Sequence, residues 1–235
     1  MSIQRWSVGM TTAPRRVLTL EASVRSVFLA GWHDVRLFAE PGTKLPADFV
    51  SLGRSDRDEK LGAFSNWYLA LSELYLRTPH ADAFMVLQDD VVLARGLREY
   101  LDNQLWPDPK VGVVSLYCPS HVTLAVGCGF GITNEGWGWW GALALVFSNP
   151  GIRAFLSDIE VLNHRHHGPD DGSRNIDSVV GAWSRRSGLP FYVHCPSLVS
   201  HIGGASTIWG DVTNTGRRRE SAFNVGFLQR GVEGQ

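Results

Sequence analysis

Two adjacent carboxylates, Asp89 and Asp90, follow a continuous apolar run at residues 83–87, with Gln88 between the run and the acids. A strand that ends in acidic residues places them at the carboxyl edge of a parallel sheet, where open α/β sheets bind their ligands. Two like charges side by side are unfavourable unless a cation offsets them, and carboxylate oxygens suit Mg²⁺ or Mn²⁺. Such a cation can bridge the phosphates of a nucleotide. The sequence therefore predicts a divalent-cation site at this pair, although an acidic pair can also form a simple solvated turn.

The segments around the acidic pair alternate between strand and helix patterns. Short apolar runs predict strands over residues 3–8, 35–39, 83–87, 111–116, 141–147 and 191–194. Apolar residues at helical spacing predict helices over residues 14–31, 61–78, 97–105 and 176–183. This alternation predicts an α/β fold with a mostly parallel sheet flanked by helices. Because no repeat, low-complexity segment or linker interrupts it, we expect a single domain over residues 1–235.

Composition excludes several classes of protein. Hydrophobic residues make up 44% of the chain and charged residues 19%, a balance that buries a core and excludes a disordered chain. A net charge of −1 gives no general attraction to nucleic acid or to an anionic membrane. Three widely spaced cysteines argue against a disulfide framework and against a structural zinc site. We therefore expect the protein to reside in the reducing environment of the cytoplasm. We expect no transmembrane segment, because no apolar stretch approaches 18 residues, and no signal peptide is visible.

The acidic motif and the order of elements resemble the GT-A glycosyltransferases, whose metal motif, DxD or a variant such as EDD, ends a central strand in the same way. The resemblance implies a Rossmann-like GT-A fold in which the motif is Gln88-Asp89-Asp90, with Gln where the family more often has an acid. It implies that Asp90 binds Mn²⁺ or Mg²⁺ directly, while Gln88 and Asp89 face the ribose and the phosphates. We expect residues 1–117 to form the nucleotide-binding half and residues 118–235 the acceptor-binding half.

By the same resemblance, the segment after the first strand cradles the nucleoside. Thr11 and Thr12 can form hydrogen bonds with a base or ribose, and Arg15 or Arg16 can meet a phosphate. Thr12 can instead cap a helix that begins at Pro14.

Four further positions match places where the family contacts the donor or the metal. Glu40 corresponds to a nucleoside-contacting acid, and Gly62 and Asn66 lie on a helix that passes over the nucleotide. Asn66 can equally face solvent. His201 corresponds to a histidine that completes the metal site, which is acceptable to Mn²⁺, although a core or loop histidine is the alternative.

A carboxylate base for the acceptor hydroxyl is expected at Asp177, at the start of a helix where inverting family members carry one. Asp177 can also be an acid that only stabilises the helix dipole. Asp170 and Asp171 are the fallback candidates.

The segment 136–141 is rich in Gly and Trp and formally satisfies G-x-G-x-x-G, but it does not open an N-terminal βαβ unit, so we reject dinucleotide binding. By resemblance it lines the donor-sugar and acceptor pocket through Trp137, Gly138 and Trp139, with core packing as the alternative. The histidines of segment 164–167 lack a partner cluster at metal spacing, which favours a polar loop over a zinc site.

Together these features predict a metal-dependent, inverting hexosyltransferase that moves a sugar from a nucleotide-sugar donor, expected to be a UDP-sugar, to an acceptor hydroxyl. The acceptor class stays open between a glycan, a lipid-linked glycan and a protein, and no feature excludes a retaining enzyme. A sugar nucleotidyltransferase is the first alternative, but the expected Gly-rich loop followed by Arg and Lys is missing at residues 9–12. A non-catalytic carbohydrate-binding module is the second, and the α/β order counts against its usual β-sandwich.

Overall fold

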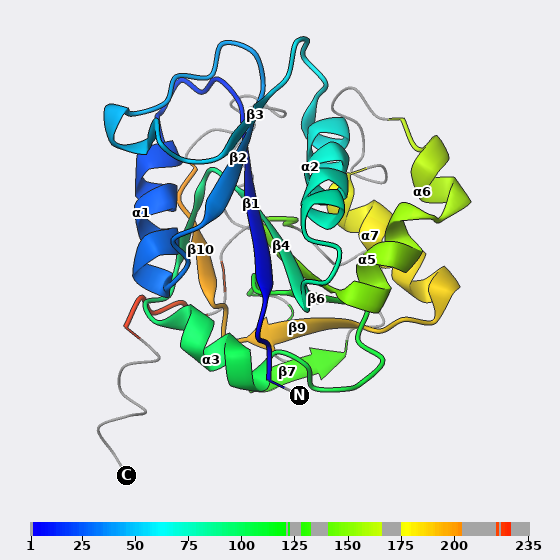
Figure 1. The fold of residues 1–235 in the computed structure, drawn as a ribbon. Coiled ribbons are helices and arrows are strands. Elements are labelled where there is room, and N and C mark those ends of the chain that lie inside the picture. The colour runs from blue at the N-terminus through cyan, green and yellow to red at the C-terminus, as the bar shows by residue number, and fades with distance from the viewer. Residues whose placement is uncertain are drawn as a thin grey trace.

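The computed structural model describes residues 2–120, 122, 128–132, 141–165, 175–203, 220 and 222–226. Within these residues the chain forms one eight-stranded sheet, in the order β3-β2-β1-β4-β8-β6-β9-β7, and a two-stranded sheet, β10-β5 (Figure 1). The strands are β1 (Trp6–Thr12), β2 (Val35–Ala39), β3 (Arg54–Asp56), β4 (Ala83–Gln88), β5 (Val91–Leu93), β6 (Val113–Ser115), β7 (Gly129–Ile132), β8 (Ala144–Ser148), β9 (Phe191–Cys195) and β10 (Val199–His201). The helices are α1 (Leu20–Ala30), α2 (Ala63–Arg77), α3 (Leu97–Gln104), α5 (Asn149–Leu156), α6 (Ile159–Asn163) and α7 (Ile176–Ser187), with a 3₁₀ turn η1 at Ala47–Phe49.

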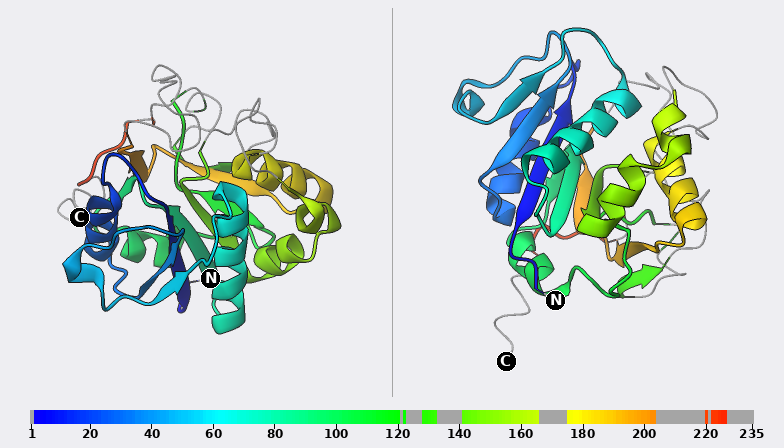
Figure 2. Two further views of the ribbon diagram at one scale, coloured as in Figure 1. Left: turned by 90° about the horizontal axis from the view of Figure 1, so that it is seen from above. Right: turned by 45° about the vertical axis from the view of Figure 1, so that its right-hand side comes forward.

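The central strand β4 shows why the apolar run at residues 83–87 has no polar alternation. Ala83, Met85 and Leu87 face the core beneath α1 and α3. Phe84 and Val86 face the core beneath α2, α5 and α7. Successive side chains point to opposite faces of a strand, so a strand covered on both faces is apolar throughout. The two helix layers are visible on either side of the sheet (Figure 2).

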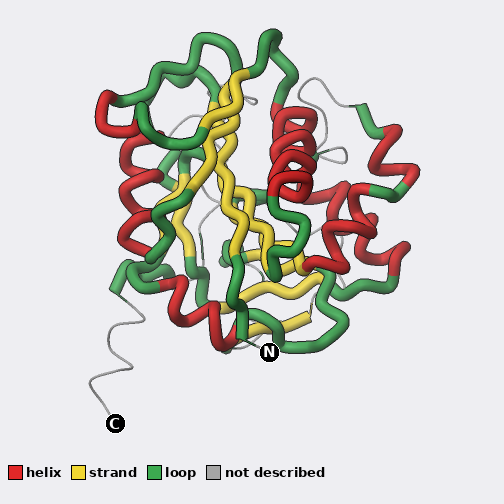
Figure 3. The backbone as a smooth tube through the Cα atoms, viewed as in Figure 1, coloured by secondary structure: helices red, strands yellow, loops and turns green. Residues whose placement is uncertain are grey.

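The sheet is mixed but mostly parallel, which confirms the predicted α/β class. Of the strand pairings that the described residues make in it, β1–β2, β1–β4, β2–β3 and β6–β9 are parallel. The pairings β4–β8, β6–β8 and β7–β9 are antiparallel. Because β1, β2 and β4 run parallel side by side, their carboxyl ends meet at one edge of the sheet (Figure 3).

The first helix begins later than the sequence predicts. Helix α1 starts at Leu20 rather than at Pro14, and Val17, an apolar residue of the predicted helix, is 60% exposed instead of packed. The predicted end is correct, because Gly31 closes the helix with φ of 110°, a conformation that glycine adopts without strain. The loop left between β1 and α1 carries Arg15.

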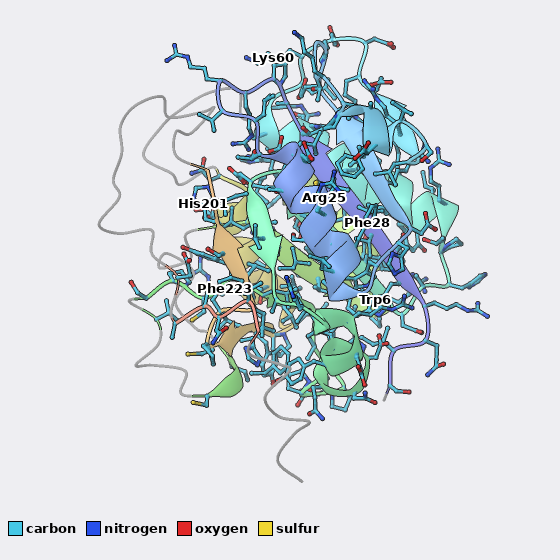
Figure 4. The ribbon with its side chains drawn as sticks, turned by 90° about the vertical axis from the view of Figure 1, so that its left-hand side faces the viewer. Trp6, Arg25, Phe28, Lys60, His201 and Phe223 are labelled. Carbon is cyan, nitrogen blue, oxygen red and sulfur yellow. The ribbon has the colours of Figure 1, made fainter. Side chains whose placement is uncertain are left out.

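Several strands also differ from the sequence prediction. The first strand is Trp6–Thr12, not residues 3–8, and the strands β3 and β7 were not expected. Strand β9 is not the last one, because β10 follows it and pairs antiparallel with β5, with His201 opposite Val91. His201 therefore lies on a strand rather than in a loop, at one end of β10 (Figure 4). No helix in the described part of the chain is both long and apolar enough to cross a membrane.

Candidate active site

The predicted acidic pair lies in the turn between β4 and β5, and it is almost completely buried. Asp89 is 2% exposed and Asp90 4%. Thr12, at the end of the neighbouring strand β1, donates a hydrogen bond from Oγ1 to Asp89 Oδ2 at 2.6 Å. Ser23 of α1 donates from Oγ to the Asp89 carbonyl oxygen at 2.9 Å. A strand end and a helix thus fix the turn, and Thr12 does not cap a helix.

Arg15 contacts both carboxylates. Its Nε donates to Asp89 Oδ1 at 2.7 Å, and its Nη1 lies 2.8 Å from Asp90 Oδ2. Burial by itself would lower the pKa of Arg15, but the charges of Asp90 and Asp89 outweigh it and hold that pKa above its usual value. The guanidinium is therefore a counter-charge for the acidic turn in this structure.

His201 approaches the same turn from β10. Its Nε2 lies 3.1 Å from Asp90 Oδ2, and the backbone N–H of Ile202 donates to the Asp90 carbonyl oxygen at 2.8 Å. Burial would raise the pKa of Asp90, yet the hydrogen bond with His201 and the charge of Arg15 outweigh it and lower that pKa. For Asp89, burial prevails over Arg15 and Thr12, so its pKa is raised. The better anionic ligand of the two is therefore Asp90.

The surroundings of Asp90 fit a divalent cation. Its Oδ1 is buried and has no hydrogen-bond partner among the residues that the structure describes. Gly203 leaves space beside it, because a Cβ on this residue would lie 2.8 Å from Asp90 Oδ2 and 2.9 Å from His201 Nε2. A carboxylate and an imidazole together suit Mn²⁺.

The site supplies few protein ligands. Within the described ranges, no group of three or more His, Cys, Asp or Glu side chains gathers to hold a metal. Ions such as Mg²⁺ are commonly held by one or two carboxylates together with substrate phosphates and water. The pair Asp90 and His201 thus fits a cation that takes its remaining ligands from a bound substrate.

Glu40 and Asn66 lie at the same edge, beyond β2, but their polar atoms contact protein groups. The two carboxylate oxygens of Glu40 accept hydrogen bonds from the backbone N–H groups of Leu61 and Gly62, at 3.0 and 2.9 Å. Asn66 is 3% exposed, so the solvent-facing alternative is wrong. Its Nδ2 donates to the Phe38 carbonyl oxygen at 3.1 Å. These contacts hold the start of α2 against the end of β2.

Gln88 and Asp177 are connected through the segment that precedes β8. The Nε2 of Gln88 donates to the Ala142 carbonyl oxygen at 3.1 Å. The neighbouring Gly141 donates its backbone N–H to Asp177 Oδ2 at 2.9 Å. Asp177 lies in the first turn of α7 and is half-buried, and its Oδ1 accepts from the Ser178 N–H at 3.1 Å.

Thr11 and His164 contact residues other than the acidic pair. Thr11 donates from Oγ1 to the Leu87 carbonyl oxygen at 3.3 Å. The ring of His164 packs edge-on against Phe64, with centroids 4.3 Å apart. Several predicted residues lie outside the described part of the chain: Trp137, Gly138, Trp139, Asp170, Asp171, His166 and His167.

Two contributors to the site, Ser23 and Gly203, were not among the predicted positions, and Arg15, which was predicted to meet a phosphate, contacts the two acids in this structure. Gly203 did carry a signal, because two glycines follow the predicted metal-binding histidine and its neighbour, as expected where backbone must approach a ligand closely. The contacts of Ser23 and Arg15 with the acidic turn have no signature in the spacing of residues along the sequence.

No protein-family model and no curated protein matches the sequence. Among solved structures, the chain is similar to GalNAc-T7 with UDP, GalNAc and Mn²⁺, with a TM-score of 0.62 at 8% identity, over 88% of this chain and 44% of that one. The chain has the GT-A fold. A second GT-A structure, the mannosyltransferase PcManGT from Pyrobaculum calidifontis in complex with GDP-Man and Mn²⁺, matches with a TM-score of 0.50 at 16% identity, over 82% of this chain and 55% of that one. The chain therefore spans about half the length of these two GT-A proteins.

Proposed function

We propose that this GT-A chain is a metal-dependent glycosyltransferase that moves a hexose from a nucleotide-sugar donor to an acceptor hydroxyl. The observation that carries the proposal is the buried carboxylate of Asp90 at the carboxyl edge of the sheet, which has a histidine beside it and one oxygen without a hydrogen-bond partner among the described residues. Both similar structures contain Mn²⁺ and a nucleotide, which is UDP in one and part of GDP-Man in the other.

In this proposal Asp90 and His201 hold Mn²⁺ or Mg²⁺. The bound ion would neutralise charge on the diphosphate leaving group. Arg15 already carries its charge at this edge, and a bound diphosphate offers it a second anionic partner. Thr12 and Ser23 each donate a hydrogen bond to Asp89 and so support the acidic turn that carries Asp90.

We further propose that Asp177 accepts the proton of the acceptor hydroxyl, which makes the enzyme inverting. The backbone N–H groups of Gly141 and Ser178 orient its carboxylate. A base held in a fixed orientation typically contributes about a hundredfold to ten-thousandfold in rate. The acceptor is a hydroxyl of a glycan, a lipid-linked glycan or a protein, and a UDP-sugar is the proposed donor.

The test is a screen for hydrolysis of UDP- and GDP-sugars with Mn²⁺, repeated after chelation and with Asp90→Ala. Asp34→Ala serves as the matched control, because Asp34 is an exposed aspartate. We expect the wild-type protein and the Asp34→Ala control to hydrolyse the donor with Mn²⁺. Chelation should abolish this activity, and Asp90→Ala should lack it. Turnover that survives both treatments would refute the metal-dependent reaction, and wild-type protein that binds neither UDP nor GDP in calorimetry would refute the donor class.

A further inference from the structure

The amide of Gln88 connects the acidic turn to the segment that orients Asp177. Gln88 is the last residue of β4, and its Nε2 donates to the Ala142 carbonyl oxygen at 3.1 Å. Its backbone N–H also donates to the Leu143 carbonyl oxygen at 2.9 Å. Gly141, one residue before Ala142, donates to Asp177 Oδ2 at 2.9 Å. Two hydrogen bonds, joined by the backbone of Gly141 and Ala142, therefore form a series from the end of β4 to the start of α7.

Gly141 is tightly confined within this series. Its φ is 121°, a conformation that side chains with a Cβ rarely adopt. A Cβ at this position would also lie 2.9 Å from the ring of Tyr117. Because the Gly141 N–H contacts Asp177 directly, a change at Gln88 that displaces Ala142 would be passed on to Asp177 through the Gly141 backbone.

We propose that Gln88 is a positioning residue, whose side-chain N–H holds the segment at Gly141 and Ala142 and, through it, the orientation of Asp177. This inference rests on the proposed function, in which Asp177 is the base. It differs from the role expected for this position, in which Gln88 faces the ribose and the phosphates.

The chemistry of the contact explains why an amide stands where the motif more often has an acid. The group opposite the side chain is a carbonyl oxygen, which only accepts hydrogen bonds. An ionised glutamate also only accepts, so it would leave two oxygens facing each other without a proton between them. A glutamine donates to that oxygen and adds no charge beside Asp89 and Asp90.

The proposal is tested with Gln88→Glu, which removes the donor, and Gln88→Met, which removes it without adding charge. Because misplacement of a reacting group by about 1 Å can cost a hundredfold in rate, we expect kcat to fall by about tenfold to a hundredfold in both variants. In Gln88→Met, which adds no charge, the KM for the donor and the affinities for Mn²⁺ and UDP, measured by calorimetry, should stay within about threefold of wild type. Gln104→Glu, an exposed glutamine in α3, is the matched control and should leave all four quantities unchanged.

Three results would overturn the proposal. Wild-type kcat in either Gln88 variant would show that the amide contact is not needed. Tighter Mn²⁺ binding by Gln88→Glu together with weaker binding by Gln88→Met would make the residue a metal ligand. Loss of UDP affinity in both variants would make it a nucleotide contact.

A second readout separates this proposal from the proposed function. Hydrogen exchange of the backbone amides at residues 141–143 should become faster in both Gln88 variants, whether or not the protein is active. Unchanged exchange there would overturn the proposed hold on the segment, whereas absence of metal-dependent turnover in the wild type would refute the function alone.

Discussion

Replacement of Arg15 by methionine removes a cation that touches both carboxylates of the acidic turn. The side chain is 12% exposed, and Nη1 lies 2.8 Å from Asp90 Oδ2. Any metal ion bound to Asp90 must share this carboxylate with the guanidinium or displace it. We therefore expect Arg15→Met to bind Mn²⁺ more tightly than the wild type when no nucleotide is present.

The size of the effect follows from the distance between the charges. Two unit charges about 4 Å apart interact by about 4 kcal/mol at an effective dielectric constant of about 20. A metal ion held by Asp90 would share that carboxylate with the guanidinium, whose Nη1 lies 2.8 Å from Oδ2, and the double charge of the ion would increase the repulsion. The Arg15 side chain can move toward solvent and relieve most of this repulsion. We therefore expect the free energy of Mn²⁺ binding to change by about 1.4 to 2.8 kcal/mol, which corresponds to about tenfold to a hundredfold in affinity.

Calorimetric titration of chelator-stripped protein with Mn²⁺ at pH 7.5 measures this change directly. With UDP present the difference between the proteins should shrink, because the diphosphate gives Arg15 another partner in the wild type. Arg15→Lys keeps the charge and Arg16→Met removes a neighbouring exposed one, so both should bind Mn²⁺ with affinities near that of the wild type. Equal or weaker Mn²⁺ binding by Arg15→Met, in a variant that remains folded, would refute the competition between the guanidinium and the metal.

Three further predictions follow from the same structure. Gly203→Ala should weaken Mn²⁺ binding by about tenfold or more, seen by calorimetry, because the new Cβ would lie 2.8 Å from Asp90 Oδ2. Asp177→Asn should keep UDP affinity while transfer falls by about a hundredfold to ten-thousandfold, measured as kcat with donor and acceptor. Burial lowers the pKa of His194, so the folded protein holds this imidazole in its neutral form. The neutral imidazole contributes its full share of the folding free energy above about pH 6.5, and this contribution is lost as the pH falls through the lowered pKa. His194→Gln should therefore flatten the dependence of Tm on pH in this acidic range, whereas His80→Gln, at an exposed position, should not.

Each of these three predictions has a contrary outcome. Wild-type Mn²⁺ affinity in Gly203→Ala would place the metal away from Asp90. Parallel loss of UDP binding and transfer in Asp177→Asn would make that residue structural. A Tm that depends on pH equally in wild type and in His194→Gln would remove the buried imidazole as the cause.

The sequence predicts best those parts of the fold where burial alone dictates residue type. Strand β4 was found almost to the residue, because helices cover both its faces and leave an apolar run that ends abruptly at the acids. Strand β2 was found with its bounds, since the turn at residues 41–42 closes it. The end of α1 at Gly31 was found because helix termination by a left-handed glycine is a local signal.

The parts that the sequence did not predict depend on contacts between distant residues. Strand β10 has three residues, too few for a period to be read, and it exists because it pairs with β5, more than 100 residues earlier. Pro14 suggested a helix start, but Thr12, which would have capped it, is hydrogen-bonded to Asp89 instead. The bridge from Arg15 to both acids likewise depends on how the loop after β1 folds back over the turn.

The pairing of β10 with β5 also bears on how the protein is made. His201 reaches Asp90 across 111 positions of sequence, so a growing polypeptide that already contains the acidic turn has no imidazole beside it. Domains generally fold as units during synthesis, so a site built from distant segments of one unit is complete only after the later segment has been made. If Asp90 and His201 hold a cation, as proposed, the complete site would therefore form only after the segment that carries His201 has left the ribosome.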